Sequence, residues 1–296
     1  MSTQPVIAGI GEILWDVYPD AAHFGGAPAN FACHAAGLGA DACMVGAVGV
    51  DTAGDDALRI LGERGVDCST VARDARHPTG SVLVRLDAHG QPSYEFASNT
   101  AWDHLQWSNE VGALAKRCDA VCFGTLAQRS PESRATVRRF IDAVPAHAIR
   151  MFDVNLRQQF HNAETITASL GLATAVKLNA EELPTVAAVC GIGAADERAM
   201  LMAVMTRFDV RLAALTRGSR GALLIAGETS HECPAPDTIA EDTVGAGDAF
   251  TAALIVGLLQ GGSLAEINRH ANAVASYVCS QHGATPALPR HLRRIS

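Results

Sequence analysis

One stretch of the chain carries the pattern that decides the fold: AVCFGTLAQRSPESRATVRRFIDAVPAHAIRMF, residues 120–152. The apolar runs at residues 120–123 and 149–152 are typical of buried strands, whose side chains are apolar on both faces. Residues 131–143 predict a helix between them, because Pro131 favours the first turn of a helix. A strand, a helix and a second strand in succession predict two parallel strands joined by a crossover helix.

The same alternation extends through most of the chain. Further strands are predicted at residues 6–11, 42–48, 175–178, 212–215 and 222–225, and further helices at residues 30–38, 55–64, 164–172, 181–189, 196–208, 246–259 and 264–279. Because the strands are apolar throughout, we expect an α/β fold whose mainly parallel sheet is covered by helices on both faces.

One segment departs from this pattern. Residues 81–86 and 93–96 alternate polar and apolar side chains and flank residues 87–91, which include Gly90. Such an arrangement predicts a β-hairpin. We expect residues 80–98 to form a small β element that projects from the main body, as a lid would.

The composition excludes several classes of protein. The 296 residues include 23 Lys and Arg against 31 Asp and Glu, a formal net charge of −8, which disfavours a nucleic-acid-binding surface. With 48% hydrophobic residues, the chain is expected to fold rather than to be disordered. Its longest apolar stretch, residues 249–259, is shorter than the roughly 20 residues that a membrane-spanning helix needs. The first residues do not have the basic start and uninterrupted apolar run of a signal peptide.

The eight cysteines are scattered mostly through apolar segments and form no Cys-x-x-Cys pair. Cys118 and Cys122 have no second pair of ligands nearby at the spacing of a zinc site. We therefore expect buried free thiols and a cytoplasmic protein, because disulfides are rare in reducing compartments.

The strongest local signal is DTVGAGD, residues 242–248, directly before a predicted helix. Glycines at a helix start leave unpaired N–H groups uncovered, and such groups bind anions such as phosphate. Asp248 would then accept a proton from a hydroxyl that attacks the bound phosphoryl group. Taken alone, the same residues also fit an ordinary helix start with an acidic first turn.

Two further motifs stand before predicted helices. In GGAPAN, residues 25–30, small residues let a ligand approach the backbone, and Asn30 offers the donor and acceptor that a sugar hydroxyl needs. Asp16 follows the first predicted strand, where α/β sheets bind ligands. In KLNAEE, residues 177–182, carboxylates between a strand and a helix could hold Mg²⁺ directly or through water. Each feature alone also fits a turn, a solvated loop or an ordinary helix start.

Two other nucleotide-binding patterns fail. Gly9-Ile10-Gly11 follows a predicted strand as a dinucleotide fingerprint should, but Leu14 stands at the next required glycine. The chain also has no Gly-x-x-x-x-Gly-Lys-Ser/Thr sequence, which excludes a P-loop.

Together, the three motifs resemble the two signature regions and the Asn-x-x-Glu motif of the ribokinase-like sugar kinases of the phosphofructokinase B type. The similarity extends from Gly9 to about Pro289. It implies a three-layer α/β/α fold with a mainly parallel central sheet and a small β lid. Residues 1–11, 33–78 and 105–296 would form the ATP-binding core, and residues 12–32 and 79–104 the lid over the sugar.

The resemblance also implies roles for individual residues. Asp248 matches the catalytic base, and Gly245, Ala246 and Gly247 match the anion hole for the transferring γ-phosphate of ATP. Asn179 and Glu182 match the residues that order Mg²⁺ and its waters, and Thr216, Gly218 and Asn272 match residues that lie along the nucleotide. Asp16, Gly26 and Asn30 match residues that contact the sugar. Asp242 and the carbonyl of Val244 match a K⁺ site.

The resemblance narrows the substrate to two sugars. Residues 11–16 with GGAPAN, and the DVNLR sequence of residues 153–157, resemble the fructokinase branch, which implies fructose as acceptor and fructose 6-phosphate as product. Arg157 would also suit the carboxylate of 2-keto-3-deoxygluconate, or form a salt bridge with Asp153. Phe96 and Trp102 would either line the sugar pocket or pack inside the lid.

Two alternatives concern partners rather than substrate. The chain could instead be a catalytically inactive protein that has the kinase fold and serves only to bind partners. The presence of Asp248 and its flanking glycines disfavours this alternative. A lid with an open apolar face would pair with a second lid in a homodimer, whereas a covered lid would leave a monomer.

Overall fold

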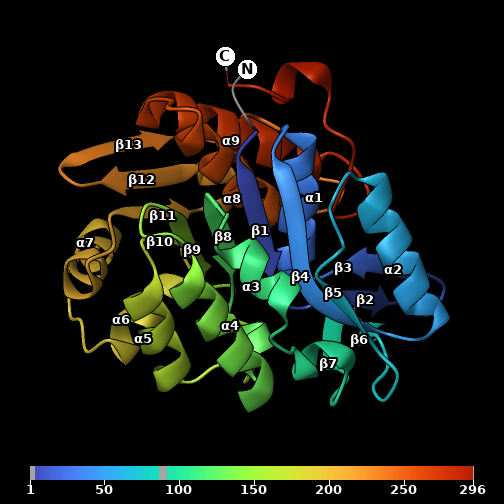
Figure 1. The fold of residues 1–296 in the computed structure, drawn as a ribbon. Helices are drawn as coiled ribbons and strands as arrows, with labels where there is room; N and C mark the ends of the chain where they lie inside the picture. The colour runs from blue at the N-terminus through green and yellow to red at the C-terminus, as the bar shows by residue number, and fades with distance from the viewer. Residues whose placement is uncertain (1–3, 87–91, 296) are drawn as a thin grey trace.

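The computed structural model describes residues 4–86 and 92–295, and it contains two β-sheets (Figure 1). Within the described residues, the larger sheet has nine strands. Their spatial order is β13 (Thr229–Cys233), β12 (Ala222–Ala226), β11 (Leu212–Thr216), β10 (Ala175–Asn179), β9 (Ile149–Asp153), β8 (Ala120–Phe123), β1 (Val6–Ile10), β4 (Asp41–Gly49) and β5 (Val71–Asp74). Neighbours from β11 to β5 run parallel, and β12 and β13 continue the sheet as antiparallel strands.

Helices cover both faces of this sheet. One face carries α1 (Ala27–Gly37), α8 (Ala246–Leu259) and α9 (Leu264–Cys279), and the other carries α3 (Asn109–Ala115), α4 (Pro131–Ala143), α5 (Ala163–Leu172), α6 (Glu182–Val189) and α7 (Glu197–Phe208). Strand β1 is apolar throughout because both of its faces are buried. Ile7 packs with the α8 side, whereas Ala8 and Ile10 pack with the α4 side. The predicted three-layer α/β/α fold is therefore confirmed.

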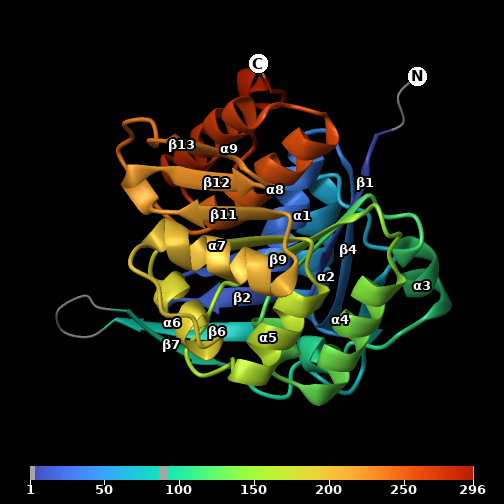
Figure 2. The ribbon, with the colours of Figure 1, turned by 90° about the vertical axis from the view of Figure 1, so that its left-hand side faces the viewer.

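The second sheet has the order β3 (Ala22–Gly25), β2 (Leu14–Val17), β6 (Gly80–Leu86) and β7 (Pro92–Phe96). It lies at the lower left of the molecule in Figure 2, and a short loop connects the carboxyl end of β1 to β2. The predicted hairpin strands are β6 and β7, while its connection, residues 87–91, lies outside the described residues.

A buried cluster attaches the second sheet to the body. Trp102, 1% exposed, packs with Leu14 and Val82 of this sheet, and its Nε1 would lie 2.3 Å from a Cβ on Gly80. The guanidinium of Arg129 stacks 3.9 Å from the Trp102 ring. Arg129 also pairs with Asp103 through two hydrogen bonds of 2.7 Å. Of the two roles expected for Trp102, the structure shows packing beneath the small sheet.

Most predicted elements are confirmed, four of them to the residue: β8, α4, α8 and α9. Helix α1 begins at Ala27, three residues earlier than predicted, because Pro28 is accommodated in its first turn. The lid limit expected at residue 32 thus falls inside α1, whose Phe31 and Ala35 pack in the core of the large sheet. We place residues 27–32 with that sheet, and the division into core and lid otherwise stays a prediction.

Five elements were not predicted: β2, β3, β5, β13 and α3. Four are strands of four or five residues with mostly partly exposed side chains, so they lack a continuous apolar run. Helix α3 has only seven residues. Short elements carry too little periodicity to be recognised from sequence, and tertiary packing decides them.

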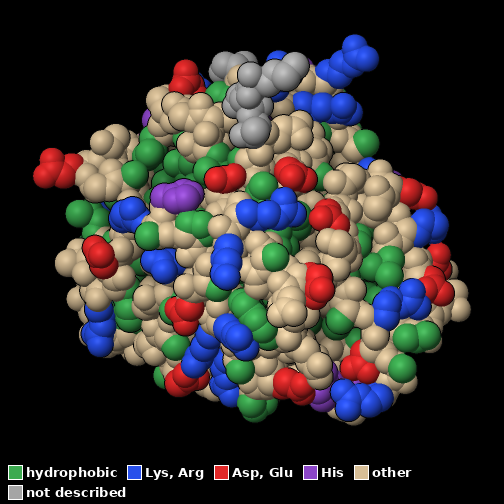
Figure 3. All heavy atoms as spheres, in the orientation of Figure 1, with side chains coloured by type: hydrophobic (Ala, Val, Ile, Leu, Met, Phe, Trp, Pro, Cys, Tyr) green, Lys and Arg blue, Asp and Glu red, His purple; other side chains and the backbone are tan. Residues whose placement is uncertain are grey.

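The surface is mixed in charge, and the cysteines are mostly buried. On the face shown in Figure 3, acidic and basic side chains are interspersed and apolar side chains occur in small groups. All eight cysteines are free thiols, and six of them are buried. In residues 4–86 and 92–295, every helix is too short or too polar to span a bilayer.

Candidate functional site

A tight turn stands at the start of α8, at the carboxyl edge of the large sheet. Gly245 caps the helix with φ 79°, and a Cβ there would lie 2.2 Å from the carbonyl oxygen of Ala284. The site therefore requires glycine for both backbone conformation and space. No side chain caps this helix start in the described structure. The N–H of Ala246 makes a long hydrogen bond of 3.4 Å to the carbonyl oxygen of Thr243, whereas the N–H groups of Gly245, Gly247 and Asp248 remain available to an anion.

Asp248 lies in that first turn and is half-buried. Its Oδ2 accepts a hydrogen bond of 2.9 Å from Nδ2 of Asn30 on α1, so the starts of two helices meet at this carboxylate. Burial, followed by the negative charge of Asp153, raises the pKa of Asp248 to about 6. Asn30, Lys177 and Arg157 act in the opposite direction and limit the shift.

Beneath the turn lies a buried ion pair. Nζ of Lys177 on β10 donates to Oδ1 of Asp153 on β9 at 3.1 Å, and the two side chains are 8% and 6% exposed. The other oxygen of Asp153 accepts a 2.8 Å hydrogen bond from Thr251 on α8. The network joins two parallel strands to the helix that carries Asp248.

Lys177 brings positive charge to the underside of the turn. Its Nζ lies 3.0 Å from the position a Cβ would take on Gly247. Burial lowers the pKa of Lys177, but the negative charges of Asp153, Glu182 and Asp248 outweigh it and raise the pKa, so the ammonium stays protonated. A buried cation and a free helix start thus face the same space.

Asn179 and Glu182 hold the junction between β10 and α6. The two oxygens of Glu182 accept hydrogen bonds of 2.8 Å from the backbone N–H groups of Asn179 and Leu156. Oδ1 of Asn179 accepts from the N–H groups of Glu181 and Glu182 at 2.9 Å. Both side chains are fixed by the backbone, and Glu182 connects the loop after β9 to the loop after β10.

The predicted sugar residues lie on the other side of Asp248. Asp16 on β2 faces Arg157, and burial raises the pKa of its carboxyl group. Gly26 has φ 107°, and a Cβ there would lie 2.4 Å from the carbonyl oxygen of Glu12. The salt bridge considered between Arg157 and Asp153 is not formed, since Asp153 pairs with Lys177 and Arg157 donates to the carbonyl of Leu156 at 3.3 Å.

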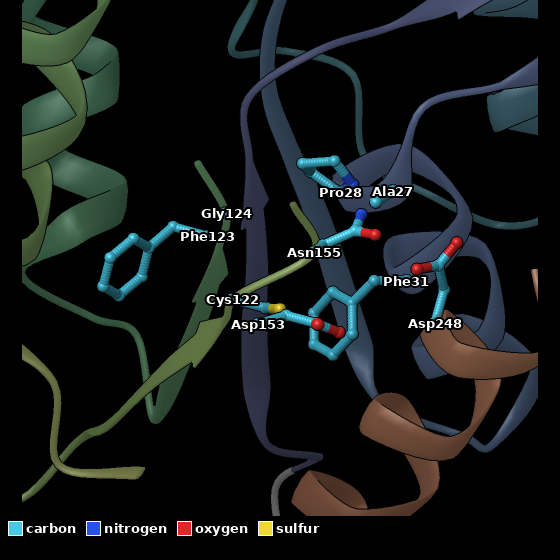
Figure 4. Close-up of a pocket in the computed structure, with 9 residues that line it drawn as sticks. All are labelled: Ala27, Pro28, Phe31, Cys122, Phe123, Gly124, Asp153, Asn155 and Asp248. Carbon is cyan, nitrogen blue, oxygen red and sulfur yellow. The ribbon is translucent and has the colours of Figure 1, made fainter. Parts of the chain in front are cut away.

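A small pocket lies between these residues. Figure 4 shows Asp248 and Asn155 pointing into it from opposite sides, with Phe31, Cys122 and Asp153 below them. Asn155 has φ 41°, a left-handed conformation that is uncommon outside glycine. That conformation directs the carboxamide of Asn155 toward the same space as the carboxylate of Asp248.

The predicted nucleotide residues lie on the far side of the turn. Thr216 ends β11 beside Asn179, and Gly218 follows it with φ 59°. Asn272 on α9 is 5% exposed, and its Nδ2 donates to the carbonyl oxygen and the side chain of Asn268 at 2.9 and 2.8 Å. Its amide N–H groups are therefore committed within the helix, and contact with an adenine stays a prediction.

The predicted K⁺ residues lie in the loop before α8. Oδ1 of Asp242 accepts from the N–H of Val244 at 2.9 Å, and Oδ2 accepts from the N–H of Gly283 at 3.2 Å. Asp242 therefore links two loops. Cation binding there stays a prediction.

Lys177 and Thr251 had no predicted role, and Asp153 was considered only as a partner of Arg157, yet the structure brings the three together under the turn. A signal existed in the sequence: Lys177 interrupts an otherwise apolar strand and is one of two lysines in the chain. A buried lysine requires a buried partner, but its partner is 24 residues away and only the sheet register brings the two together.

Comparison with known proteins identifies the family of the chain and proteins of similar fold. Residues 21–291 match the model of the pfkB family of carbohydrate kinases. A fructokinase of Klebsiella pneumoniae is 31% identical over 299 residues, which cover 95% of each chain. The crystal structure of a sugar kinase from Pyrococcus horikoshii in complex with ATP has a TM-score of 0.80 at 29% identity and covers 94% of each chain. A fructokinase from Vibrio cholerae O395, solved with fructose, ADP and calcium, has a TM-score of 0.82 at 25% identity over 97% of each chain.

The two glycines of the turn should respond differently to substitution. Gly245→Ala should lower the free energy of unfolding by about 1–3 kcal/mol, because alanine is strained at this φ and meets a backbone oxygen. Gly247→Ala should change it by less than about 1 kcal/mol, since only the flexible end of Lys177 must move. Urea unfolding monitored by circular dichroism measures both. Equal stability of the two variants would contradict the steric role of Gly245.

Proposed function

The chain belongs to the pfkB family of carbohydrate kinases, and we propose that it transfers the γ-phosphoryl group of ATP to a hydroxyl of a small neutral sugar, with fructose as the first candidate and fructose 6-phosphate as the product. One observation carries the proposal: the carboxylate of Asp248 lies in the first turn of a glycine-capped helix, directly above a buried lysine.

In this proposal the turn stabilises the phosphoryl group during transfer. The N–H groups of Gly245, Ala246 and Gly247 point at the place where negative charge develops on its oxygens. A preorganised donor of this kind typically contributes about 3–4 kcal/mol to transition-state stabilisation. Lys177, fixed by Asp153, adds a positive charge from below, and being buried it is little screened by water.

Asp248 acts as the general base. With a pKa of about 6 it is mostly ionised at neutral pH, yet it is basic enough to accept a proton as the hydroxyl attacks phosphorus. Asn30 fixes its orientation through the 2.9 Å hydrogen bond. The proton moves from the sugar hydroxyl to Asp248 while the bond from oxygen to phosphorus forms and ADP leaves.

The side chains near the turn fit a magnesium ion that is bound mainly by the phosphates of ATP. Among the described residues, no group of three His, Cys, Asp or Glu side chains could hold a metal. Mg²⁺ usually keeps several waters and binds through phosphates with one or two carboxylates. Glu182 would reach it through water, with Asn179 fixing the loop. The ion would neutralise charge on the transferring group.

The remaining assignments complete the two substrate sites. Thr216, Gly218 and Asn272 would lie along the nucleotide, and Asp242 with the carbonyl of Val244 would bind a K⁺ ion. The β2, β3, β6 and β7 sheet would close over the sugar, and closure would exclude water that could otherwise accept the phosphoryl group.

A lid-mediated homodimer stays part of the proposal. Of the large hydrophobic side chains exposed in the described chain, Tyr94 is the one on the lid strands.

The free thiols fit a reducing compartment such as the cytoplasm.

The charges around Arg157 favour a neutral acceptor. Its positive charge lowers the pKa values of Glu12, Asp16 and Asp248, against the larger effect of burial. These groups already compensate its charge, so a further carboxylate on the substrate would be repelled. Fructose therefore precedes 2-keto-3-deoxygluconate among the candidates.

Asp248→Asn should lower kcat by at least about 10³-fold, because the amide cannot accept the proton. ATP affinity should stay within about twofold, since the N–H groups of the turn are unchanged. Coupled ADP release and calorimetric ATP binding measure the two quantities. Asp142→Asn, an exposed change on α4, is the control. Normal turnover by Asp248→Asn would refute the assignment of the base.

The rate should also depend on pH through Asp248. Protonation removes its ability to accept a proton, so kcat should fall about tenfold per pH unit below about pH 6. The negative charge of Asp153 raises the pKa of Asp248, so Asp153→Asn should move this fall to lower pH. A midpoint that stays fixed or moves to higher pH would contradict the proposed coupling.

A panel of acceptors tests the substrate. ADP release should be measured with fructose, 2-keto-3-deoxygluconate, ribose, tagatose and adenosine. We expect the highest kcat/KM with fructose and at least about a tenfold lower value with the keto acid, because one repelled charge is worth at least 1.4 kcal/mol here. Preference for the keto acid would overturn the charge argument. Turnover of none of them would favour the non-catalytic alternative.

A further inference from the structure

Glu12 is a buried acid that the proposed reaction does not use. It lies in the loop between β1 and β2 and is 3% exposed. Its Oε2 has no hydrogen-bond partner within residues 4–86 and 92–295. Buried carboxylates are normally paired or hydrogen-bonded through both oxygens, so this free oxygen requires an explanation.

The surroundings place Glu12 at the same site as Asp248. Its carbonyl oxygen lies against Gly26, and the N–H of Ala27 at the start of α1 favours the ionised carboxylate. The charged groups that face it are Arg157, after β9, and Asp248, on α8. Burial raises the pKa of Glu12 to about 7, and nearby backbone N–H groups and Arg157 limit the rise.

A second unpaired acceptor belongs to Asn30, the partner of Asp248. Oδ1 of Asn30 is also buried without a hydrogen-bond partner in the described chain, while Nδ2 of the same side chain donates to Asp248. Two free acceptors therefore flank the carboxylate of Asp248. A ligand that brings hydrogen-bond donors would satisfy both, and a sugar carries several hydroxyl donors on neighbouring carbons.

We propose that Glu12 is a further sugar-binding residue, whose Oε2 accepts a hydrogen bond from a hydroxyl other than the one that Asp248 activates, while Oδ1 of Asn30 accepts from another. The assignment rests on the proposed function, and it extends that function by naming a substrate with at least two hydroxyls besides the phosphorylated one. Glu12 also supplies negative charge opposite Arg157, so it contributes to the preference for neutral sugars.

The test is the variant Glu12→Gln, which preserves the size of the side chain but replaces one of its two acceptor oxygens with an NH₂ donor. At pH 8 the KM for fructose should rise roughly tenfold or more, and the KM for ATP should stay within twofold. Glu228→Gln, an exposed change in the turn between β12 and β13, is the matched control and should leave both constants unchanged. An unchanged KM for fructose, or an equal rise in both constants, overturns the assignment.

Thermal stability separates binding from a structural role. Because burial raises the pKa of Glu12, its ionised form opposes folding above about pH 7, and the neutral amide removes that effect. The Tm of Glu12→Gln at pH 8 should therefore equal or exceed that of the wild type. A lower Tm with unchanged sugar affinity would make Glu12 a structural residue and would overturn the proposal.

Deoxy sugars provide a test that does not depend on how the variant folds. The test uses fructose derivatives that each lack one hydroxyl. For at least one of them, the wild type should bind the derivative roughly tenfold more weakly than fructose. The variant Glu12→Gln should bind that same derivative and fructose equally well. If each missing hydroxyl lowers affinity by the same factor in both proteins, Glu12 contacts none of them. If the wild-type protein phosphorylates no sugar, the proposed function itself is refuted. If it phosphorylates fructose, but the effect of the missing hydroxyl and the effect of Glu12→Gln simply add, only the role of Glu12 is refuted.

Discussion

The buried ion pair between Lys177 and Asp153 is the interaction on which the rest of the site depends. It crosses from β10 to β9 at the carboxyl edge of the sheet and continues through Thr251 into α8. Two charges in the core are stable only when their geometry is fixed, and breaking such a pair is strongly destabilising. The pair therefore holds the start of α8 in one position over the sheet. It also places a positive charge under the turn and a negative charge near Asp248, and that negative charge adds to burial in raising the pKa of the carboxylate.

The second constraint is the meeting of two helix starts. Gly26 and Gly245 both have positive φ, and neither α1 nor α8 is capped by a side chain. Each start has an acid beside it, since Asp248 belongs to α8 and Glu12 reaches α1 from the preceding loop. Acids are favoured at such positions by the helix dipole but opposed by burial. The resulting carboxyl groups are poised near neutral pH, which suits a site that must accept a proton and bind hydroxyl groups.

The sequence predicted the framework well, and its failures have physical causes. Helices α4 and α9 are long and amphipathic, and α8 is long and apolar over most of its length, so the limits of all three were predicted to the residue. Strands β2 and β3 were not predicted, because four-residue strands with partly exposed side chains resemble loops. The glycine turn and Asp248 were recognised because their neighbours in sequence are also their neighbours in space. Lys177 was passed over because its partner Asp153 is adjacent only through strand pairing.

The sequence by itself determined the class of fold and the local chemistry of the α8 turn. Apolar strands alternating with helices can bury their surfaces only as a covered parallel sheet, and glycines before a helix expose N–H groups wherever the helix lies. The tertiary structure decided which charges share one environment. Glu12, Asn30 and Asp248 come from three separate segments. The raised pKa values of the two acids and the unpaired oxygens of Glu12 and Asn30 arise from burial. Desolvation and charge interactions depend on distance in space, which local sequence does not encode.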